Sequence, residues 1–281
     1  MPDDNLLAER FEAHRPLLRA VAGRMLGSTA EADDAVQETW LRLSKADGVD
    51  NLESWLRTVV SRISLDMLRS RKAKREEPID WHPPAEVDGP EREAVLVDEV
   101  GRAMLVVLDR LAPAERVAFV LHDMFAVPFD EIASVVDRTP VTTKKLASRA
   151  RQKVRGAETL TTPNDTQVVE AFLQASREGD LEALLAILAP DVMRRADAAA
   201  LPKGRSTVVR GRDAVAREML VLGKRARFAE PALVNGKSGA VVAPNGQLRL
   251  VLVITIVNRL VSGYEVIADP ECLETVDIAV P

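Results

Sequence analysis

The chain has 281 residues, of which 47% are apolar and 29% charged, and its formal net charge is -5. These values are typical of a folded, water-soluble protein of two or three domains and exclude a disordered or fibrous chain. A single cysteine excludes an internal disulfide, and the lack of Cys/His clusters leads us to expect no metal and no cofactor. The acidic start lacks the apolar segment of a signal peptide, and the longest apolar run, Leu250 to Val257, is too short to cross a bilayer. We therefore expect a cytoplasmic protein without membrane contact.

Three amphipathic helices are predicted near the N-terminus. Apolar residues recur at three- and four-residue steps from Leu7 to Met25, which is the pattern of a helix with one buried side. Thr29 is the predicted N-cap of a second helix, and a third helix begins near Leu52. Residues 55–75 hold seven basic side chains and one acidic side chain, so the third helix is strongly positive.

A linker and a second helical segment are predicted to follow. Residues 76–93 contain four prolines and several acids, which exclude a helix interior and favour an interdomain linker. Helical periodicity then resumes around Glu91. A short helix from Phe129 to Val136, a tight turn and a helix capped by Thr139 together indicate a helix-turn-helix.

The last helix of this segment is predicted to bind DNA. From Thr139 to Arg155 it has six Lys or Arg side chains and no carboxylate. A helix in the major groove needs positive charge for phosphates and short polar side chains near its N-terminal end for base edges. A solvated basic surface helix is the simpler interpretation, but the missing acids and the second basic helix upstream disfavour it. We predict that Val141, Leu146, Ala150 and Val154 pack inward, and that DNA is contacted by Thr142, Thr143, Lys144, Lys145, Ser148 and Arg149.

The remainder of the chain is predicted to be an α+β domain. Its charge is nearly balanced, with 15 acids and 14 bases between Asn164 and Pro281. Thr166 to Leu188 is predicted to be helical, and alternating apolar segments beyond it predict strands. Asn235-Gly236 and Pro244-Asn245-Gly246 are turn signals between such strands.

Three stretches resemble the conserved regions of bacterial extracytoplasmic-function (ECF) sigma factors. They are DAVQETWLRL, WLRTVVSRISLDMLRSRKAKR and LAPAERVAFVLHDMFAVPFDEIASVVDRT, in the order and spacing of that family, and the likeness covers roughly residues 5–155. The stretch VVEAFLQASREGDLEALLAILAPDV, which opens the last third, resembles SnoaL-like domains of the NTF2-like cone fold. Sigma factors with such an extension form a known subgroup, the SigJ type.

The resemblance implies a multidomain fold with two all-α sigma domains followed by an α+β NTF2-like cone domain. The expected parts are a region 2 domain at 1–75, the linker at 76–93, a region 4 helix-turn-helix domain at 94–157 and a SnoaL-like domain at 164–281. The implied function is transcription initiation without enzymatic activity. Such a factor binds core RNA polymerase at the β′ coiled coil and the β flap and directs it to promoter DNA, and its extension modulates this activity in cis.

The resemblance also implies three sets of contact residues. The set that meets the β′ coiled coil is Asp33, Asp34, Gln37 and Glu38. The set on the phosphates of the -10 element is Arg62, Arg69, Arg71, Lys72 and Arg75, and the loop 50–54 would capture unpaired bases. The predicted DNA-binding helix would read the -35 element. Trp55, at the start of the third helix, is interpreted as a core residue rather than a base-stacking one.

The extension carries its own expectations. A Trp-and-Pro motif typical of the subgroup's linker is matched by Asp80, Trp81, Pro83 and Pro84. We predict that Trp81 docks onto the C-terminal domain. Two further motifs of the subgroup are altered here, since the loop 196–205 keeps a single glycine and Asp269 and Cys272 stand where the subgroup has Asn and Lys. The resemblance therefore does not carry over the regulatory contacts made through these two loops.

A different class of protein is the alternative. A helix-turn-helix regulator with a fused small-molecule-binding or enzymatic domain would explain residues 111–281 but not the first 75. All three histidines lie outside 164–281 and no clustered carboxylate pair stands out there, so catalysis is not expected. Aliphatic residues such as Val251, Val253 and Ile267 are interpreted as core rather than pocket lining. An anti-sigma factor or a small-molecule ligand stays open as a further partner.

Overall fold

The computed structural model describes residues 2–76, 101–155, 163–202, 204–222, 228–244 and 247–280. The chain divides into two compact units. The first comprises Met1–Val100 and Leu108–Arg151, and the second comprises Gly101–Val107 and Gln152–Pro281. The predicted linker at 76–93 lies outside the described residues except for its first position, and so do Asp80, Trp81, Pro83 and Pro84.

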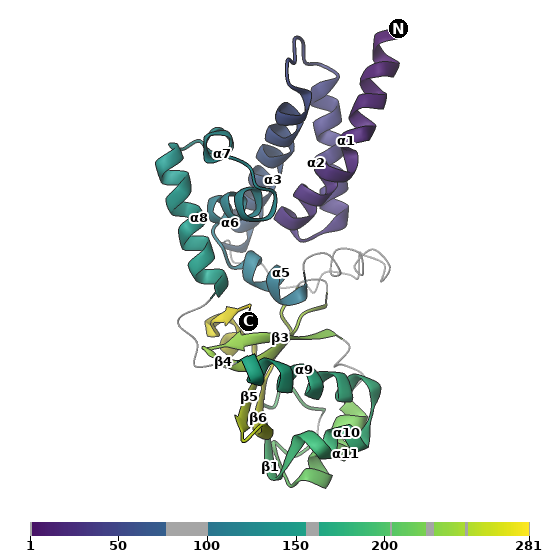
Figure 1. The fold of residues 1–281 in the computed structure, drawn as a ribbon, viewed down its shortest axis with the longest axis vertical. Helices are drawn as coiled ribbons and strands as arrows, with labels where there is room; N and C mark the ends of the chain where they lie inside the picture. Colours follow the sequence, from purple (N-terminus) through teal and green to yellow (C-terminus); the bar gives the residue numbers. More distant parts are fainter. Residues whose placement is uncertain are drawn as a thin grey trace. The chain divides into compact units, whose positions relative to one another are not determined.

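Three helices form the N-terminal part of the first unit. They are α1 (Pro2–Leu26), α2 (Thr29–Leu43) and α3 (Leu52–Glu76), and they lie side by side in Figure 1. Phe11, Leu18 and Leu56 are buried between them, as the three- and four-residue spacing predicts. The N-cap of α2 is Ser28 rather than Thr29, because the Ser28 hydroxyl accepts from the backbone N–H of Glu31 at 3.3 Å.

From Arg102 on, the helical prediction for the next segment is also confirmed, whereas its predicted start around Glu91 lies outside the described residues. The described elements are α5 (Arg102–Asp109), α6 (Pro113–Phe119), the π-helix η1 (Val120–Met124), α7 (Phe129–Val136) and α8 (Pro140–Arg155). Between α7 and α8, Asp137 adopts the left-handed conformation with φ of 55°, which reverses the chain within a few residues. Helices α7 and α8 therefore form the predicted helix-turn-helix.

The second unit is an α+β domain, as predicted. Its helices are α9 (Pro163–Glu178), α10 (Leu181–Ile187), α11 (Arg212–Leu222) and α12 (Pro270–Thr275). Its strands are β1 (Leu188–Ala196), β2 (Val208–Arg210), β3 (Ala229–Val234), β4 (Lys237–Val242), β5 (Leu250–Val257), β6 (Leu260–Ile267) and β7 (Ile278–Ala279). In the described part they form one sheet in the order β2-β1-β6-β5-β4-β3-β7, with β1 parallel to β6 and the other neighbours antiparallel.

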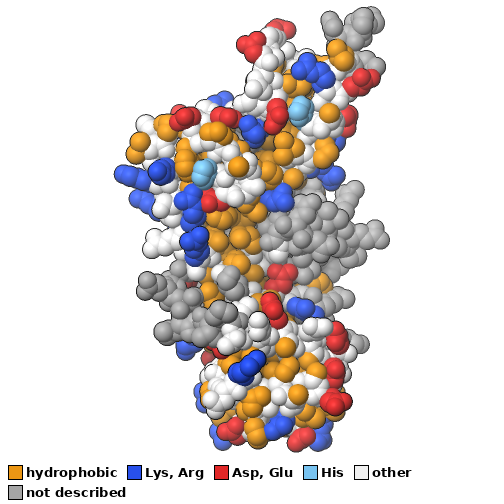
Figure 2. All heavy atoms as spheres, in the orientation of Figure 1, with side chains coloured by type: hydrophobic (Ala, Val, Ile, Leu, Met, Phe, Trp, Pro, Cys, Tyr) orange, Lys and Arg blue, Asp and Glu red, His pale blue; other side chains and the backbone are white. Residues whose placement is uncertain are grey.

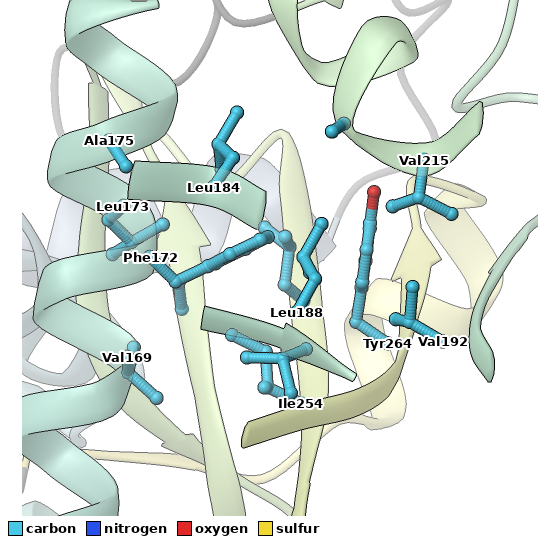
Figure 3. Close-up of a cluster of buried hydrophobic side chains, with 14 of the residues drawn as sticks. Val169, Phe172, Leu173, Ala175, Leu184, Leu188, Val192, Val215, Ile254 and Tyr264 are labelled. Atoms are coloured by element: carbon cyan, nitrogen blue, oxygen red, sulfur yellow. The ribbon is translucent and has the colours of Figure 1, made fainter. Parts of the chain in front are cut away.

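Helices α9, α10 and α11 cover one face of this sheet and bury an apolar cluster against it. Figure 3 shows Phe172, Leu188 and Tyr264 gathered in its centre, and the rings of Phe172 and Tyr264 lie 5.5 Å apart. Strand β5 contributes Leu252 and Ile254 to the cluster. Because side chains alternate along a strand, Val251 lies on the other face, where it is also fully buried, whereas Val253 and Ile267 are half-buried.

The prediction that Thr166 to Leu188 is helical is confirmed as far as Ile187, and the helical stretch is divided into two helices. Gly179, with φ of 68°, ends α9, and the Asp180 carboxylate caps α10 by accepting from the backbone N–H of Ala183 at 3.0 Å. The Asn235-Gly236 hairpin between β3 and β4 is confirmed, with φ of 51° and 72° at its two turn residues. Among the described helices, none is long and apolar enough to span a membrane.

Candidate nucleic-acid interface

The start of α8 is set by a local cap. The Thr139 hydroxyl accepts from the backbone N–H of Thr142 at 3.2 Å, and the two threonine hydroxyls lie 2.9 Å apart. Pro140 follows as the first helical residue, where its missing N–H removes no helical hydrogen bond. The N-terminal turn of the helix, with its free backbone N–H groups, is therefore rigidly defined.

One face of α8 packs inward and the other is open to solvent. The inward positions are Thr143, Ala147, Ala150 and Val154, all buried, with Leu146 at the margin. The prediction that Val141 packs inward is wrong, because its side chain is 67% exposed. Thr143 takes the inward place, since its hydroxyl is satisfied by donating to the carbonyl of Thr139 at 3.0 Å. Thr143 is therefore unavailable to a ligand on the outer face.

The outer face carries the other predicted DNA-binding residues. Lys144, Lys145, Ser148 and Arg149 are exposed, and Thr142 is half-buried. Figure 2 shows Lys and Arg side chains gathered over α8. Arg151, nearer the C-terminal end, pairs instead with Asp123 at 2.5 Å. The outer face thus combines positive charge with a hydroxyl on a rigid helix, as recognition of a nucleic-acid groove requires.

The basic side chains predicted on α3 are in different environments. Arg69 is exposed and lies 3.5 Å from Asp66, and Lys72 is exposed. Arg71 is half-buried, donates to the carbonyl of Leu26 at 3.1 Å and pairs with Glu31. The side chain of Arg75 lies outside the described residues. In this arrangement Arg71 holds α3 against the turn between α1 and α2.

Three α3 side chains bind α7, the first helix of the helix-turn-helix. The Arg57 guanidinium donates to the Glu131 carboxylate at 2.9 Å, and the Ser54 hydroxyl donates to the same oxygen at 3.2 Å. Arg62 donates to the backbone carbonyl of Ser134 at 2.8 Å. We name this set, Ser54, Arg57 and Arg62 against Glu131 and Ser134, the α3–α7 contact. Sequence reasoning placed Arg62 on DNA and gave no signal for its partner.

The loop before α3 and the helix start are also held in place. The Asn51 side chain accepts from the backbone N–H of Ser54 at 3.1 Å and so caps the helix. Asp50 and Asn51 are exposed, whereas Trp55 is half-buried. Of the predicted loop 50–54, Asp50 and Asn51 face solvent, whereas Leu52 begins α3 and is buried and Ser54 bonds Glu131. Trp55 is half-buried and is not among the fully buried side chains.

Arg116 of α6 is almost fully buried beside the α1–α2 turn. A Cβ atom on Gly27 would lie only 3.2 Å from its Nη2. Its Nη1 lies 3.4 Å from Asp109, and its Nε has no hydrogen-bond partner among the described residues. Burial lowers the pKa of Arg116 to about 10, because desolvation disfavours the charged guanidinium.

The predicted polymerase-binding residues of α2 lie on the side of the helix that is not buried. Asp34 and Gln37 are exposed, whereas Asp33 pairs with Arg19 at 2.6 Å and Glu38 pairs with Arg42 at 2.9 Å. The opposite face of α2 is buried, at Ala32, Ala35, Val36, Thr39 and Leu43. Sequence reasoning missed Leu41, which is 46% exposed one turn beyond Gln37 and adds an apolar side chain to the same face. The one sign of this in the sequence is that Leu41 is apolar but does not fall on the spacing of the buried residues of α2.

Comparisons with known proteins decide the family. Residues 10–74 match Sigma-70 region 2, and residues 101–154 match Sigma-70, region 4. The chain is 40% identical over 251 residues to the ECF RNA polymerase sigma factor SigJ of Mycobacterium tuberculosis, covering 83% of this chain and 80% of SigJ.

The chain belongs to the ECF RNA polymerase sigma factors.

Two more similarities extend over nearly the whole sigma factor. SigI of Mycobacterium tuberculosis, also described as an ECF RNA polymerase sigma factor, is 33% identical over 292 residues, covering 98% of this chain and 97% of SigI. The crystal structure of Mycobacterium tuberculosis SigJ is 35% identical and covers 95% of this chain and 98% of that chain, with a TM-score of 0.47. The two family matches and the SigJ and SigI sequence similarities assign the sigma factor to promoter-specific transcription initiation, which requires core RNA polymerase and promoter DNA. A stand-alone helix-turn-helix regulator is disfavoured, because it leaves the region 2 match unexplained.

The second unit of the sigma factor brings together the two loops that depart from the subgroup pattern. The Asp197 carboxylate accepts from the backbone N–H groups of Ala268 and Asp269 at 2.7 and 2.8 Å. Asp269 in turn caps α12 by accepting from the N–H groups of Glu271 and Cys272 at 3.0 and 3.1 Å. The two loops are joined through Asp197 without the residues that the subgroup pattern has there.

The polar groups inside the second unit are satisfied by one another. Arg194 pairs with Glu218 inside the domain, and the Tyr264 hydroxyl donates to the sulfur of Met219 at 3.1 Å. Burial, with the nearby Glu218 charge, raises the pKa of Tyr264 well above its ordinary value. No cluster of three or more His, Cys, Asp or Glu side chains suited to a metal occurs among the residues that the structure describes.

Proposed function

We propose that this sigma factor reads a promoter with two separate helices of its region 2 and region 4 domains while its SnoaL-like domain regulates it in cis. The domains are assigned to residues 1–75, 94–157 and 164–281, joined by the linker at 76–93. Transcription takes place in the bacterial cytoplasm, where we place the protein. The observation that carries the proposal is the outer face of α8, which follows a capped turn and bears Lys144, Lys145, Ser148 and Arg149.

Helix α8 is the proposed reader of the -35 element. In helix-turn-helix proteins the N-terminal residues of the second helix contact base edges in the major groove. Thr142 and Ser148 are suited to base edges, and Lys144, Lys145 and Arg149 to bases or phosphates. Thr143 is left out of this set because it is buried.

Helix α3 and the loop before it are the proposed readers of the -10 element. Arg69 and Lys72 are exposed on α3, where their positive charge suits phosphates. Arg62 and Arg71 must first leave Ser134, Leu26 and Glu31. Asp50 and Asn51, the exposed part of the predicted loop 50–54, are suited to holding unpaired bases, which are captured outside regular duplex structure.

The acidic face of α2 is the proposed contact with the β′ coiled coil of core polymerase. Asp34 and Gln37 are exposed there, and Leu41 supplies apolar area beside them. Acidic and polar residues around an exposed apolar side chain suit a basic partner helix. Region 4 is the proposed partner of the β flap.

The SnoaL-like domain is the proposed regulator rather than an enzyme. Its buried carboxylate and hydroxyl, Glu218 and Tyr264, are both engaged with other side chains, which argues against a general acid or base. We propose that Trp81 of the linker docks on this domain and transmits its state to the sigma domains. An anti-sigma factor or a small-molecule ligand would act through the same domains.

Transcription with purified core polymerase tests the proposal. The full-length factor is added to core polymerase on fragmented DNA of the source bacterium, and transcript starts are mapped. We expect starts that share a -10 and a -35 element, lost with Lys145→Ala or Arg149→Ala and kept with Arg10→Ala, an exposed arginine on α1. Without factor-dependent starts the proposal is wrong.

The polymerase contact is tested by assembly with core polymerase, and the regulatory role of the linker is tested in the transcription assay. Asp34→Arg should weaken assembly with core polymerase, measured by co-sedimentation, whereas Glu170→Arg, an exposed acid on α9, should not. Trp81→Ala should change the amount of transcript while Trp81→Phe preserves it. Equal amounts of transcript from the natural factor, Trp81→Ala and Trp81→Phe would exclude the proposed role of Trp81.

A further inference from the structure

The most exposed large apolar side chain in the described part of the chain lies on the proposed DNA-reading face. Val141 of α8 is 67% exposed, more than any other large hydrophobic residue in the described ranges. It does not contribute to packing, and a β-branched residue is not favoured in a helix by its own propensity. A polar residue would therefore serve the helix equally well at this position if solvent were its only neighbour.

Val141 lies on the same side of α8 as basic residues of the outer face. Steps of three and four residues bring Val141, Lys145, Ser148 and Gln152 onto one side of the helix, opposite the buried Thr143, Ala147 and Ala150. Val141 is the second residue of α8, directly after the Thr139 cap and Pro140. It is thus the apolar member of an otherwise polar and positive face, at the end of the helix that approaches base edges.

We propose that Val141 reads a thymine of the -35 element through the C5-methyl group. This inference rests on the proposed function of α8. In the major groove the thymine methyl is the apolar feature of the base edges, and small aliphatic side chains contact it in known recognition modes. Lys145 and Arg149 hold phosphates or guanines nearby, while the two methyl groups of Val141 exclude water from the thymine methyl. Val141 thereby favours an A·T pair over a G·C pair at one position.

Uracil substitution isolates this contact. Deoxyuridine pairs as thymidine does and lacks only the C5-methyl group, so the base pair is unchanged. Holoenzyme made with the full-length factor is bound to a promoter from the transcript map, in which each thymine of the -35 element is replaced in turn by uracil. For the natural factor we expect affinity to fall about fourfold at one position, the effect of one buried methyl-sized group.

Substitutions of Val141 complete the test. Val141→Ala should bind the thymine promoter about fourfold more weakly and should no longer distinguish thymine from uracil at that position. Val141→Thr keeps one methyl group and should retain part of the discrimination. The control is Val221→Ala, since Val221 is a 60% exposed valine on α11 that should have no effect.

Several outcomes would overturn the inference. These are equal thymine and uracil affinity at every position, a thymine preference that Val141→Ala leaves intact, and a -35 element of G·C pairs alone. Failure of the factor to direct polymerase to any promoter would overturn the proposed function as well. Promoter binding without a methyl dependence would overturn this inference and leave the proposed function standing.

Discussion

Arg194 of β1 and Glu218 of α11 form a two-pronged ion pair inside the second unit, with Nε and Oε2 2.9 Å apart. Arg194 is 2% exposed, and its third donor bonds the carbonyl of Ser206 at 2.9 Å. The pair connects the strand that is parallel to β6 with a helix that covers the sheet. The charges are compensated only by one another, so their energetic effect depends on both being present.

Removing one member of this pair should strongly destabilise the second unit. Glu218→Leu leaves a buried guanidinium without its carboxylate, and we expect the free energy of unfolding to fall by about 3–5 kcal/mol. Urea denaturation followed by circular dichroism measures this. Arg194→Met combined with Glu218→Leu should recover most of the loss, because no buried charge remains. This account would be contradicted if the double variant lost as much free energy of unfolding as Arg194→Met and Glu218→Leu lose in sum when each is measured alone.

The α3–α7 contact predicts that Glu131 stabilises the first unit. Glu131→Ala removes the acceptor of both Ser54 and Arg57, and Arg57 Nε is already without a hydrogen-bond partner in the described part of the chain. We expect a loss of about 1–3 kcal/mol in the free energy of unfolding. Asp130→Ala is the matched control, since Asp130 is the exposed neighbour on the same helix. Equal effects of the two substitutions would show that Glu131 contributes nothing specific.

Replacement of Arg116 should not destabilise the first unit, in contrast to replacement of Glu131. Its lowered pKa of about 10 means that the charged form is less stable in the folded state than in the unfolded one. At neutral pH this charge therefore reduces stability, and the penalty stays constant up to about pH 10 and lessens as pH rises through that value toward the ordinary pKa of arginine. Arg116→Met keeps similar volume without the charge, so we expect unchanged or increased thermal stability. A fall of several degrees in Tm would show that the Asp109 interaction outweighs desolvation.

Tyr264 is the single tyrosine of the chain, which makes its titration directly measurable. Its raised pKa means that the folded state retains the phenolic proton where the unfolded state has lost it. The contribution of Tyr264 to stability is therefore complete below about pH 10 and is lost as pH rises through the folded-state value. In an alkaline titration, tyrosinate absorbance should appear together with the loss of circular dichroism. Tyr264→Phe is the control without the absorbance, and tyrosinate in a still folded protein near pH 10 would contradict the prediction.

Local signals account for what the sequence predicted correctly. The helix-turn-helix was predictable because Thr139 and Pro140 mark a helix start by short-range chemistry, and the Asn235-Gly236 turn requires left-handed residues. The Gly179-Asp180 break between α9 and α10 was also a local signal, hidden within a continuous apolar periodicity. The basic helices were also predictable, because a run of Lys and Arg side chains with few or no acids is visible within a short stretch of sequence.

Long-range relationships account for most of what was missed. Ser54 and Glu131 are far apart in the chain, and nothing in either stretch indicates the other. The parallel pairing of β1 with β6 likewise joins distant segments. The sequence prediction placed Val141 inward and Thr143 outward, the reverse of the structure, because hydrophobicity alone was used to assign the inner face of α8. A threonine whose hydroxyl bonds the preceding turn can be buried as readily as a valine.

The bond from the Val280 backbone N–H to the Val154 carbonyl, 3.0 Å long, has a consequence for synthesis on the ribosome. Val154 lies in the last turn of α8, whereas Val280 directly follows β7, which is translated after the other strands that the structure describes. During translation the final turn of α8 is therefore made long before the residue that bonds its carbonyl. A nascent chain can complete the proposed DNA-reading face of α8 early, but it secures the C-terminal end of that helix only when β7 has left the exit tunnel.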